Sequence, residues 1–171
     1  MVFHMTVAAE MTSLETLAAG VGQLLQGRGM TIAVAESCTG GHFADQLTNV
    51  PGASGWFVGG VVAYSNAVKT LWLGVPEELL QRHGAVSAEV AGAMAEGVRR
   101  SAGTTLGLAV TGIAGPSGGT PAKPVGTVYI ALAAAAKTEV THHCIQRDRR
   151  EFKIIVGITA LDYVRRYCLS R

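Results

Sequence analysis

The sequence predicts one α/β domain over residues 1–171, in which helices cover both faces of a mixed β-sheet in a three-layer α/β/α arrangement. Its 171 residues match the usual size of a single domain. Short β-branched and apolar runs alternate with stretches of helical periodicity, which favours parallel strands joined by helices. Two strand-like runs then follow each other near the C-terminus, as in an antiparallel hairpin. The sheet should therefore contain both kinds of pairing.

The first elements are a helix, a strand and a second helix. Thr12 and Glu15 match a capping box, and apolar residues then recur at helical spacing up to Gly27. About residues 1–11, which precede this pattern, are expected to be disordered. A strand is predicted over 31–35, and a short helix over 42–47.

The rest of the chain continues the alternation. Lys69 lies in a short helix that ends near Gly74, Pro76 suits the first turn of the next helix, and Ser87 can cap an alanine-rich helix. The predicted strands are 58–64, 106–110, 125–134 and 139–145; the predicted helices end at His83, at Arg100 and, after a start near Arg149, at Cys168.

Composition excludes several classes of protein. Fourteen Lys and Arg against twelve Asp and Glu give a net charge of +2, spread along the chain, so no nucleic-acid partner is expected. The longest apolar run, 125–136, is far shorter than the roughly 20 residues of a spanning helix, so no membrane partner is expected either. The first ten residues lack the features of a secretory signal, which predicts a cytoplasmic protein.

The cysteines do not indicate a disulfide or a zinc site. Cys38, Cys144 and Cys168 are odd in number and widely spaced, which fits reduced thiols. His142, His143 and Cys144 are consecutive, but adjacent residues on a strand point to opposite faces and cannot easily converge on one ion. We expect neither a metal nor a cofactor.

Three segments that follow predicted strands carry hydroxyl groups together with glycines or a cation. They are ESCTGG at 36–41, YSNAVK at 64–69 and TGIAGPSGG at 111–119. Ligands of open α/β sheets gather at the carboxyl ends of the strands, so these segments are expected to form one pocket.

The first segment predicts a nucleophile beside an anion-binding turn. Paired glycines at a helix start expose backbone N–H groups that can hold a phosphate or an oxyanion, and Ser37 lies beside them. Alternatively, Ser37 or Thr39 only caps the helix while the glycines form the turn. On the first interpretation, Cys38, Thr39, Gly40 and Gly41 contact substrate.

Lys69 is the candidate base. A buried lysine whose pKa is lowered can accept the proton of a serine hydroxyl, a variant of triad chemistry. A solvated surface lysine is the alternative. Tyr64 could relay a proton or bind substrate, against the alternative of ordinary core packing.

The third segment can approach a ligand through its backbone. Its glycines include Gly112 and Gly115, and Thr111 stands at its start. There is no G-x-x-x-x-G-K-S/T pattern, so ATPase function is poorly supported.

Taken together, AESCTGG, GGVVAYSNAVK, GAVS, TGIAGPSGG and KPVGTVY, in this order, closely resemble the C-terminal domain of the CinA family of competence and damage-inducible proteins. The resemblance covers about residues 14–161. It implies a three-layer α/β/α fold and metal-free hydrolysis of nicotinamide mononucleotide to nicotinic acid mononucleotide and ammonia, the nicotinamide mononucleotide deamidase reaction of pyridine nucleotide salvage.

The resemblance also implies roles for individual residues. Ser37 corresponds to the nucleophile, Lys69 to its base, and Tyr64 and Thr111 to polar members of the site. Arg149 corresponds to an arginine that faces substrate. The usual Gly-Asp-Arg-like stretch of the family reads Arg147-Asp148-Arg149-Arg150 here, which leaves the choice among the three arginines open.

Two alternatives remain at this point. Cys38 rivals Ser37 as nucleophile, because a thiolate is intrinsically the more reactive group. The domain could also be a non-catalytic nucleotide-binding accessory module linked to competence or the DNA damage response. Small α/β enzymes are commonly symmetric assemblies, so a homo-oligomer, in the simplest case a dimer, is expected.

Overall fold

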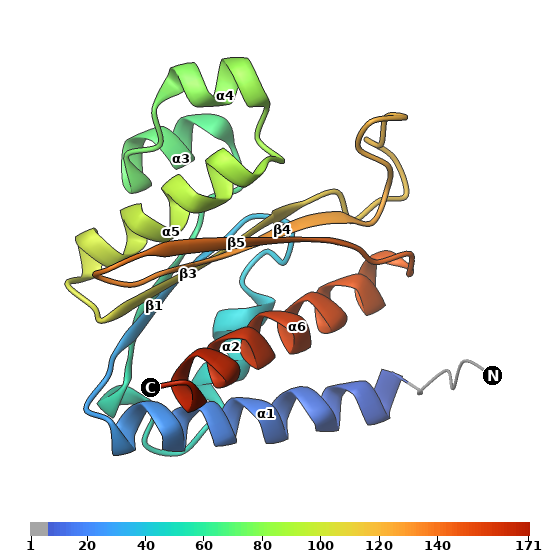
Figure 1. Ribbon diagram of the computed structural model, residues 1–171. Helices are drawn as coiled ribbons and strands as arrows, with labels where there is room; N and C mark the ends of the chain where they lie inside the picture. Colours follow the sequence, from blue (N-terminus) through green and yellow to red (C-terminus); the bar gives the residue numbers. More distant parts are fainter. Residues whose placement is uncertain (1–6) are drawn as a thin grey trace.

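A five-stranded mixed sheet forms the centre of the computed structural model, which describes residues 7–171 (Figure 1). The strands lie in the order β2-β1-β3-β4-β5. β1 pairs in parallel with β2 and β3, whereas β4 and β5 are antiparallel to their neighbours, as the sequence predicts. The strands are β1 (Ile32–Glu36), β2 (Phe57–Val62), β3 (Leu106–Gly112), β4 (Thr127–Ala133) and β5 (Thr138–Cys144).

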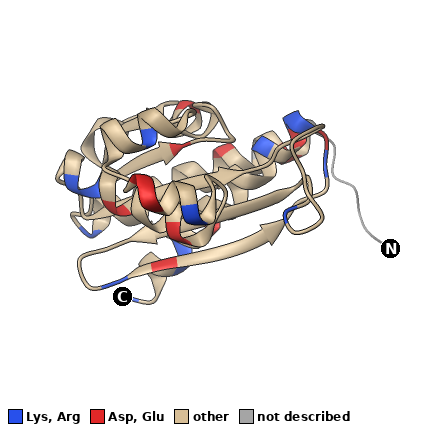
Figure 2. Ribbon diagram, turned by 90° about the horizontal axis from the view of Figure 1, so that it is seen from above, with Lys and Arg blue, Asp and Glu red and all other residues tan. Residues whose placement is uncertain are grey.

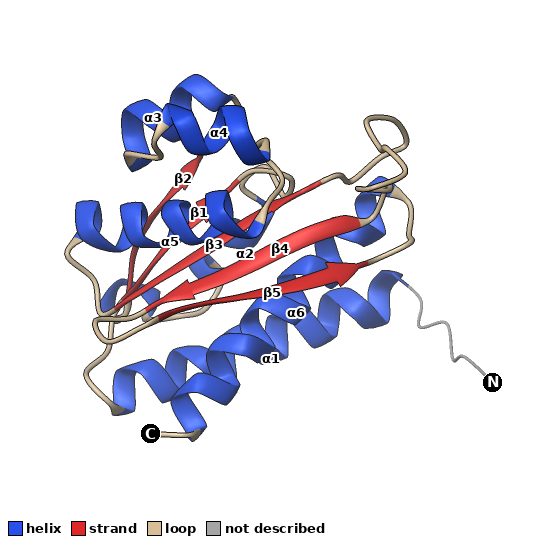
Figure 3. Ribbon diagram, turned by 45° about the horizontal axis from the view of Figure 1, so that its top comes forward, coloured by secondary structure: helices blue, strands red, loops and turns tan. Residues whose placement is uncertain are grey.

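Helices cover both faces of this sheet, which gives the three-layer α/β/α fold (Figure 3). One layer holds the first, second and last helices, and the other holds the three helices between β2 and β3. A 3₁₀ turn, Ala53–Gly55, precedes β2. The helices are α1 (Val7–Gly27), α2 (His42–Thr48), α3 (Asn66–Leu73), α4 (Glu77–His83), α5 (Ala88–Ala102) and α6 (Arg149–Leu169).

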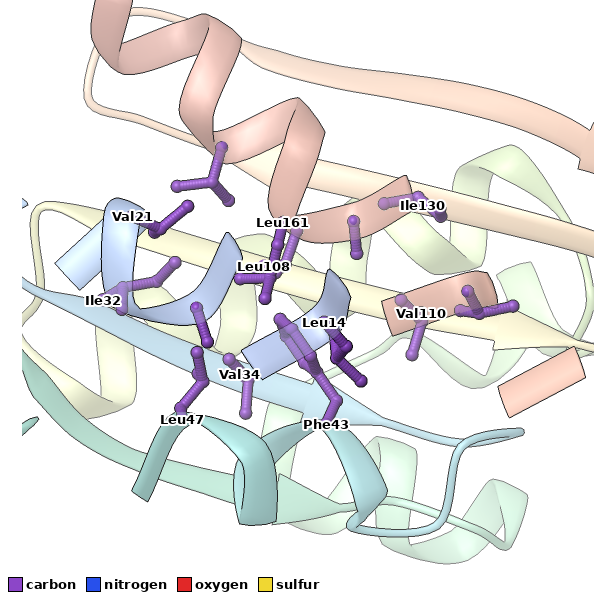
Figure 4. Packing of buried hydrophobic residues seen from close by; sticks show 14 of the residues in the cluster. Leu14, Val21, Ile32, Val34, Phe43, Leu47, Leu108, Val110, Ile130 and Leu161 are labelled. Atoms are coloured by element: carbon purple, nitrogen blue, oxygen red, sulfur yellow. The ribbon is translucent and has the colours of Figure 1, made fainter. Parts of the chain in front are cut away.

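The two layers pack on the sheet through different residues. Large apolar side chains of α1, α2 and α6 meet the sheet on one face, among them Leu14, Phe43 and Leu161 (Figure 4). α1 and α6 approach closely, because a Cβ on Gly157 would lie 3.2 Å from the Leu14 side chain. The other face is rich in alanine, and α5 sits so near that a Cβ on Gly107 would lie 2.2 Å from the Ala95 carbonyl.

Several predicted boundaries require correction. α1 begins at Val7, so Thr12 is inside the helix and the expected disorder is wrong for residues 7–11. Packing of Met11 on the core stabilises these added turns. The remaining part of that prediction, residues 1–6, lies outside the described residues. Pro76 caps α4 and is not in its first turn.

Two strands are shorter than predicted. β4 begins at Thr127, because Gly126 has a φ angle of 96°, which is not the extended backbone of a strand. β2 ends at Val62, which leaves Tyr64 beyond the strand. Conversely, β3 extends through Thr111 to Gly112, both expected in the loop.

The surface carries interspersed charges of both signs, as Figure 2 shows on the ribbon. Of the helices within residues 7–171, none combines the length and apolar character needed to cross a membrane.

Candidate active site

The carboxyl ends of β1, β2 and β3 meet beside one another. The Ser37 N–H donates to the Val110 carbonyl at 3.0 Å, and the Ala63 N–H donates to the Glu36 carbonyl at 2.8 Å. Strand pairing therefore continues one residue past β1 on each side. This fixes the backbone of Ser37 between the segments that carry Tyr64 and Thr111.

Ser37 and Lys69 form a buried pair at this edge. Lys69 Nζ lies 3.1 Å from Ser37 Oγ, and the lysine is only 1% exposed. Ser65 caps α3 through the Val68 N–H, which directs Lys69 in the first turn of that helix back toward β1. The alternative of a solvated surface lysine is wrong, because the side chain is enclosed.

Burial shifts the protonation equilibrium of Lys69 toward the neutral amine. Nζ also contacts the carbonyl oxygens of Ala63 at 2.7 Å and Tyr64 at 3.2 Å. Among the described residues no carboxylate forms an ion pair with it, and burial lowers its pKa below the ordinary value of 10.5. A neutral amine keeps two N–H groups for the two carbonyls. Its lone pair is then left for the Ser37 hydroxyl.

Glu36, the residue before Ser37, holds the turn in place from the opposite side. Its buried carboxylate accepts hydrogen bonds from the N–H groups of Gly41 at 3.0 Å, Phe43 at 3.1 Å and Ala44 at 2.6 Å. The expectation that Gly41 offers its N–H to substrate is therefore wrong, since Glu36 occupies it. The proposed capping of α2 by Ser37 or Thr39 is also wrong, because Gly41 is the N-cap and the Glu36 carboxylate accepts the first N–H groups of the helix.

Three N–H groups of the turn remain available. Within residues 7–171, the amides of Cys38, Thr39 and Gly40 donate to no other residue. Gly40 and Gly41 have φ angles of 63° and 92°, a left-handed backbone that side chains with a Cβ rarely adopt. The two glycines thus produce the turn that leaves these donors unpaired.

Arg149 reaches the same edge from the start of α6. Its guanidinium donates to the Gly115 carbonyl at 2.9 Å and to the Tyr64 hydroxyl at 3.1 Å. Gly115 thus holds the arginine through its carbonyl. Tyr64 is 62% exposed, so the alternative of ordinary core packing for its ring is wrong.

A cavity of about 210 Å³ opens at this point. Thr111 is buried in its wall and donates its hydroxyl proton to the Ala85 carbonyl at 2.8 Å, which fixes the loop before α5. The cavity is lined by Ser37, Cys38, Tyr64, Lys69, Ala85, Val86, Thr111, Gly112, Ala114 and Arg149. A larger hollow beside α3 and α4 contains neither Ser37 nor Lys69.

Cys38 borders the cavity, but its thiol is poorly suited to attack. Burial raises its pKa to about 12, so the thiol stays protonated at neutral pH and is a poor nucleophile. Ser37, with an amine 3.1 Å away, is the better placed nucleophile.

The structure separates the three arginines. Arg147 bonds the Gln146 carbonyl and lies 3.9 Å from Glu151, beside a different hollow. Arg150 is exposed, and Arg149 lines the cavity.

The consecutive histidines that the sequence offers as possible metal ligands have other partners. His142 stacks on Tyr129, and His143 forms a hydrogen bond with Thr141. In the part of the chain that is described, no cluster of His, Cys, Asp or Glu is placed to hold a metal.

Sequence reasoning missed two contributions to the site. The first is Glu36. An acidic residue directly before a glycine turn and a helix start can accept backbone N–H groups, and this signal is present in the sequence. Ala85 and Val86 belong to the GAVS motif, yet nothing local indicates that they line a cavity. A long-range contact, the hydrogen bond from Thr111 to Ala85, holds this segment at the cavity.

Fold and site together define a three-layer α/β/α protein with a buried serine–lysine pair in a pocket at the carboxyl ends of its parallel strands. The sequence model of the CinA C-terminal domain matches residues 14–168. The chain belongs to this family.

The relatives support this assignment. A CinA-like protein of Syntrophotalea carbinolica is 51% identical over 153 residues, which cover 90% of this chain and 37% of that protein. One from Citrifermentans bemidjiense is 55% identical over 148 residues, with 86% and 36% covered. The chain therefore spans a little over a third of the length of these relatives.

Solved structures share the fold. A CinA superfamily protein of Klebsiella pneumoniae superposes with a TM-score of 0.89 at 29% identity, covering 92% of this chain and 99% of that one. A competence/damage-inducible protein of Agrobacterium tumefaciens gives 0.85 at 36% identity, covering 97% and 98%.

Proposed function

We propose that this domain hydrolyses nicotinamide mononucleotide to nicotinic acid mononucleotide and ammonia, with Ser37 as nucleophile and Lys69 as its base. The observation that carries the proposal is the buried contact of 3.1 Å between Lys69 Nζ and Ser37 Oγ. Two carbonyls hold the amine, and no described carboxylate pairs with it. A buried lysine whose pKa is lowered can accept the proton of a serine hydroxyl.

The mechanism has two stages. Neutral Lys69 accepts the Ser37 proton as Oγ attacks the carboxamide carbon, and the Cys38 N–H stabilises the oxyanion. The lysine proton passes to the leaving nitrogen, so ammonia departs and a nicotinoyl ester remains on Ser37. Lys69 then takes a proton from water, whose oxygen attacks the ester. Nicotinic acid mononucleotide leaves, and Ser37 regains its proton.

The size of the cavity suits the reacting part of such a substrate. Pockets for whole ligands usually measure about 300–1,000 Å³, more than the 210 Å³ found here. A pyridine ring with its carboxamide would occupy the cavity while the ribose phosphate extends past its mouth. The guanidinium of Arg149, held by the Tyr64 hydroxyl and the Gly115 carbonyl, lines the cavity.

The direct test is to incubate the purified, chelator-treated protein with nicotinamide mononucleotide and to measure ammonia and the acid product together. We expect equimolar release of both. Ser101→Ala, at an exposed position near the end of α5, is the matched control for Ser37→Ala and should retain full turnover. Binding of the mononucleotide without ammonia release would instead support the non-catalytic accessory module.

A further inference from the structure

The long loop between β3 and β4, residues 113–126, is tied to the connection between α4 and α5. Lys123 Nζ donates to the His83 carbonyl at 2.7 Å, and the lysine is half-buried. Within residues 7–171 no carboxylate forms an ion pair with Lys123. The loop and the connection both lie toward the end of the sheet at which β3 finishes (Figures 1 and 3). The ammonium of Lys123 therefore holds a backbone carbonyl of a distant segment.

The turn that carries Lys123 and the glycine that faces it make this contact possible. The Lys123 N–H donates to the Thr120 carbonyl at 3.1 Å and to the Thr120 hydroxyl at 3.0 Å, and the Thr120 N–H donates back to the Lys123 carbonyl at 2.9 Å. Gly84 has a φ angle of 74° and a ψ angle of 163°, a conformation that is essentially confined to glycine. A Cβ on Gly84 would lie 3.7 Å from Lys123 Nζ. The backbone on both sides of the contact is thus fixed.

The segment that Lys123 holds continues into a wall of the cavity. Ala85 and Val86 line the cavity, and the Ala85 carbonyl accepts the Thr111 hydroxyl at 2.8 Å. Two carbonyls of one short segment are therefore held, one by the end of β3 and one by the loop that follows it. Lys123 is not among the lining residues. Any influence that it has on the site must act through this wall.

We infer that Lys123 is a positioning residue. By holding the His83 carbonyl, it keeps the wall formed by Ala85 and Val86 in place beside Ser37. The inference rests on the proposed function, since this wall orients the pyridine ring so that its carboxamide faces the nucleophile. A misplacement of about 1 Å can lower a rate on the order of 100-fold. An ammonium outside the cavity thereby controls the chemistry without touching the substrate.

The kinetic test replaces Lys123 and follows ammonia release from nicotinamide mononucleotide. Lys123→Met keeps a long side chain that cannot donate, so kcat should fall about 10- to 100-fold, because the ring loses its orientation, while KM changes by less than about threefold. Lys123→Arg, which can donate to the same carbonyl, should restore most of the loss. Lys137→Met, in the turn between β4 and β5 at the opposite end of β3, is the matched control and should keep wild-type values.

Two outcomes of this assay would overturn the inference. Wild-type kcat in Lys123→Met would show that the wall does not depend on the lysine. A loss that Lys123→Arg fails to restore, or one that shifts the midpoint of the pH dependence caused by Lys69, would show general damage to the site. The midpoint should stay unchanged, because Lys123 forms no hydrogen bond with Ser37 or Lys69.

Hydrogen exchange tests the inference separately from the proposed reaction. The Gly84 N–H donates to the Leu80 carbonyl at 3.0 Å and the Val90 N–H to the Ser87 hydroxyl at 3.3 Å, so a peptide covering 84–90 reports on the wall. Its amides should exchange about 10-fold faster in Lys123→Met and at the wild-type rate in Lys137→Met. Faster exchange in a protein that releases no ammonia would support the role of Lys123 and reject the proposed function. Unchanged exchange would overturn the inference whatever the activity.

Discussion

Glu36 and Ser37 are neighbours in the chain, yet they belong to two contrasting regions. The Glu36 carboxylate faces the α2 layer, where three backbone N–H groups satisfy it. Ser37 faces the α3 layer and meets an amine that has no described counter-charge. A buried ionisable group whose partners are complete stabilises structure, whereas one left without a counter-charge is available for proton transfer. Successive side chains of an extended chain point to opposite faces of the sheet, so Glu36 and Ser37 face different layers.

Removing the nucleophile should have the largest effect. Ser37→Ala deletes the only atom that forms a bond to substrate in the proposed mechanism, so kcat for ammonia release should fall on the order of 10⁴-fold or more. Steady-state ammonia assays with Ser101→Ala as control measure this. Retained turnover in Ser37→Ala would exclude the serine as nucleophile.

Replacing the base comes next. Lys69→Met should lower kcat about 10²- to 10⁴-fold, the usual contribution of general base catalysis. In the wild type, kcat/KM should rise with pH as Lys69 loses its proton, with a midpoint below 10.5 because burial lowers its pKa. The variant should lose this limb of the profile. A limb that persists in Lys69→Met would assign it to another group.

The Glu36 region should respond in stability more than in chemistry. Glu36→Gln leaves one acceptor oxygen where three N–H groups converge, so the free energy of unfolding should fall by about 1–3 kcal/mol. Urea unfolding monitored by circular dichroism gives this value. Glu96→Gln, exposed and bonded among the described residues only to Thr138, should change it by less than about 0.5 kcal/mol. Equal effects would remove the contrast between the two regions.

The smallest effect is expected at Cys38. Because burial raises the pKa of its thiol to about 12, Cys38→Ala should alter kcat/KM by less than about threefold. The rate of ammonia release by the variant measures this change. Activity of the wild type that alkylating reagents leave unchanged would agree with it. A large loss in Cys38→Ala with activity retained in Ser37→Ala would reverse the assignment of the nucleophile.

The sequence predicted which segments meet, because strand order and chain direction place the ends of parallel strands at one edge. The sequence could not predict which hydrogen-bond donors within these segments are already paired and which face the cavity. Whether Gly41 is free depends on the Glu36 side chain, and whether Arg149 or Arg147 enters the cavity depends on the rotation of α6 against the sheet. The capping box at Thr12 failed for a related reason, since packing of Met11 on the core extends α1 past a local signal.

The close pairing of α1 with α6 affects how the protein folds during synthesis. Leu14 packs against Gly157, so α1 cannot complete its packing until α6, the helix that follows all five strands, has been synthesised. Until then its apolar stripe is exposed, and contacts this distant in sequence form slowly. A nascent chain that ends before α6 should therefore depend on chaperones.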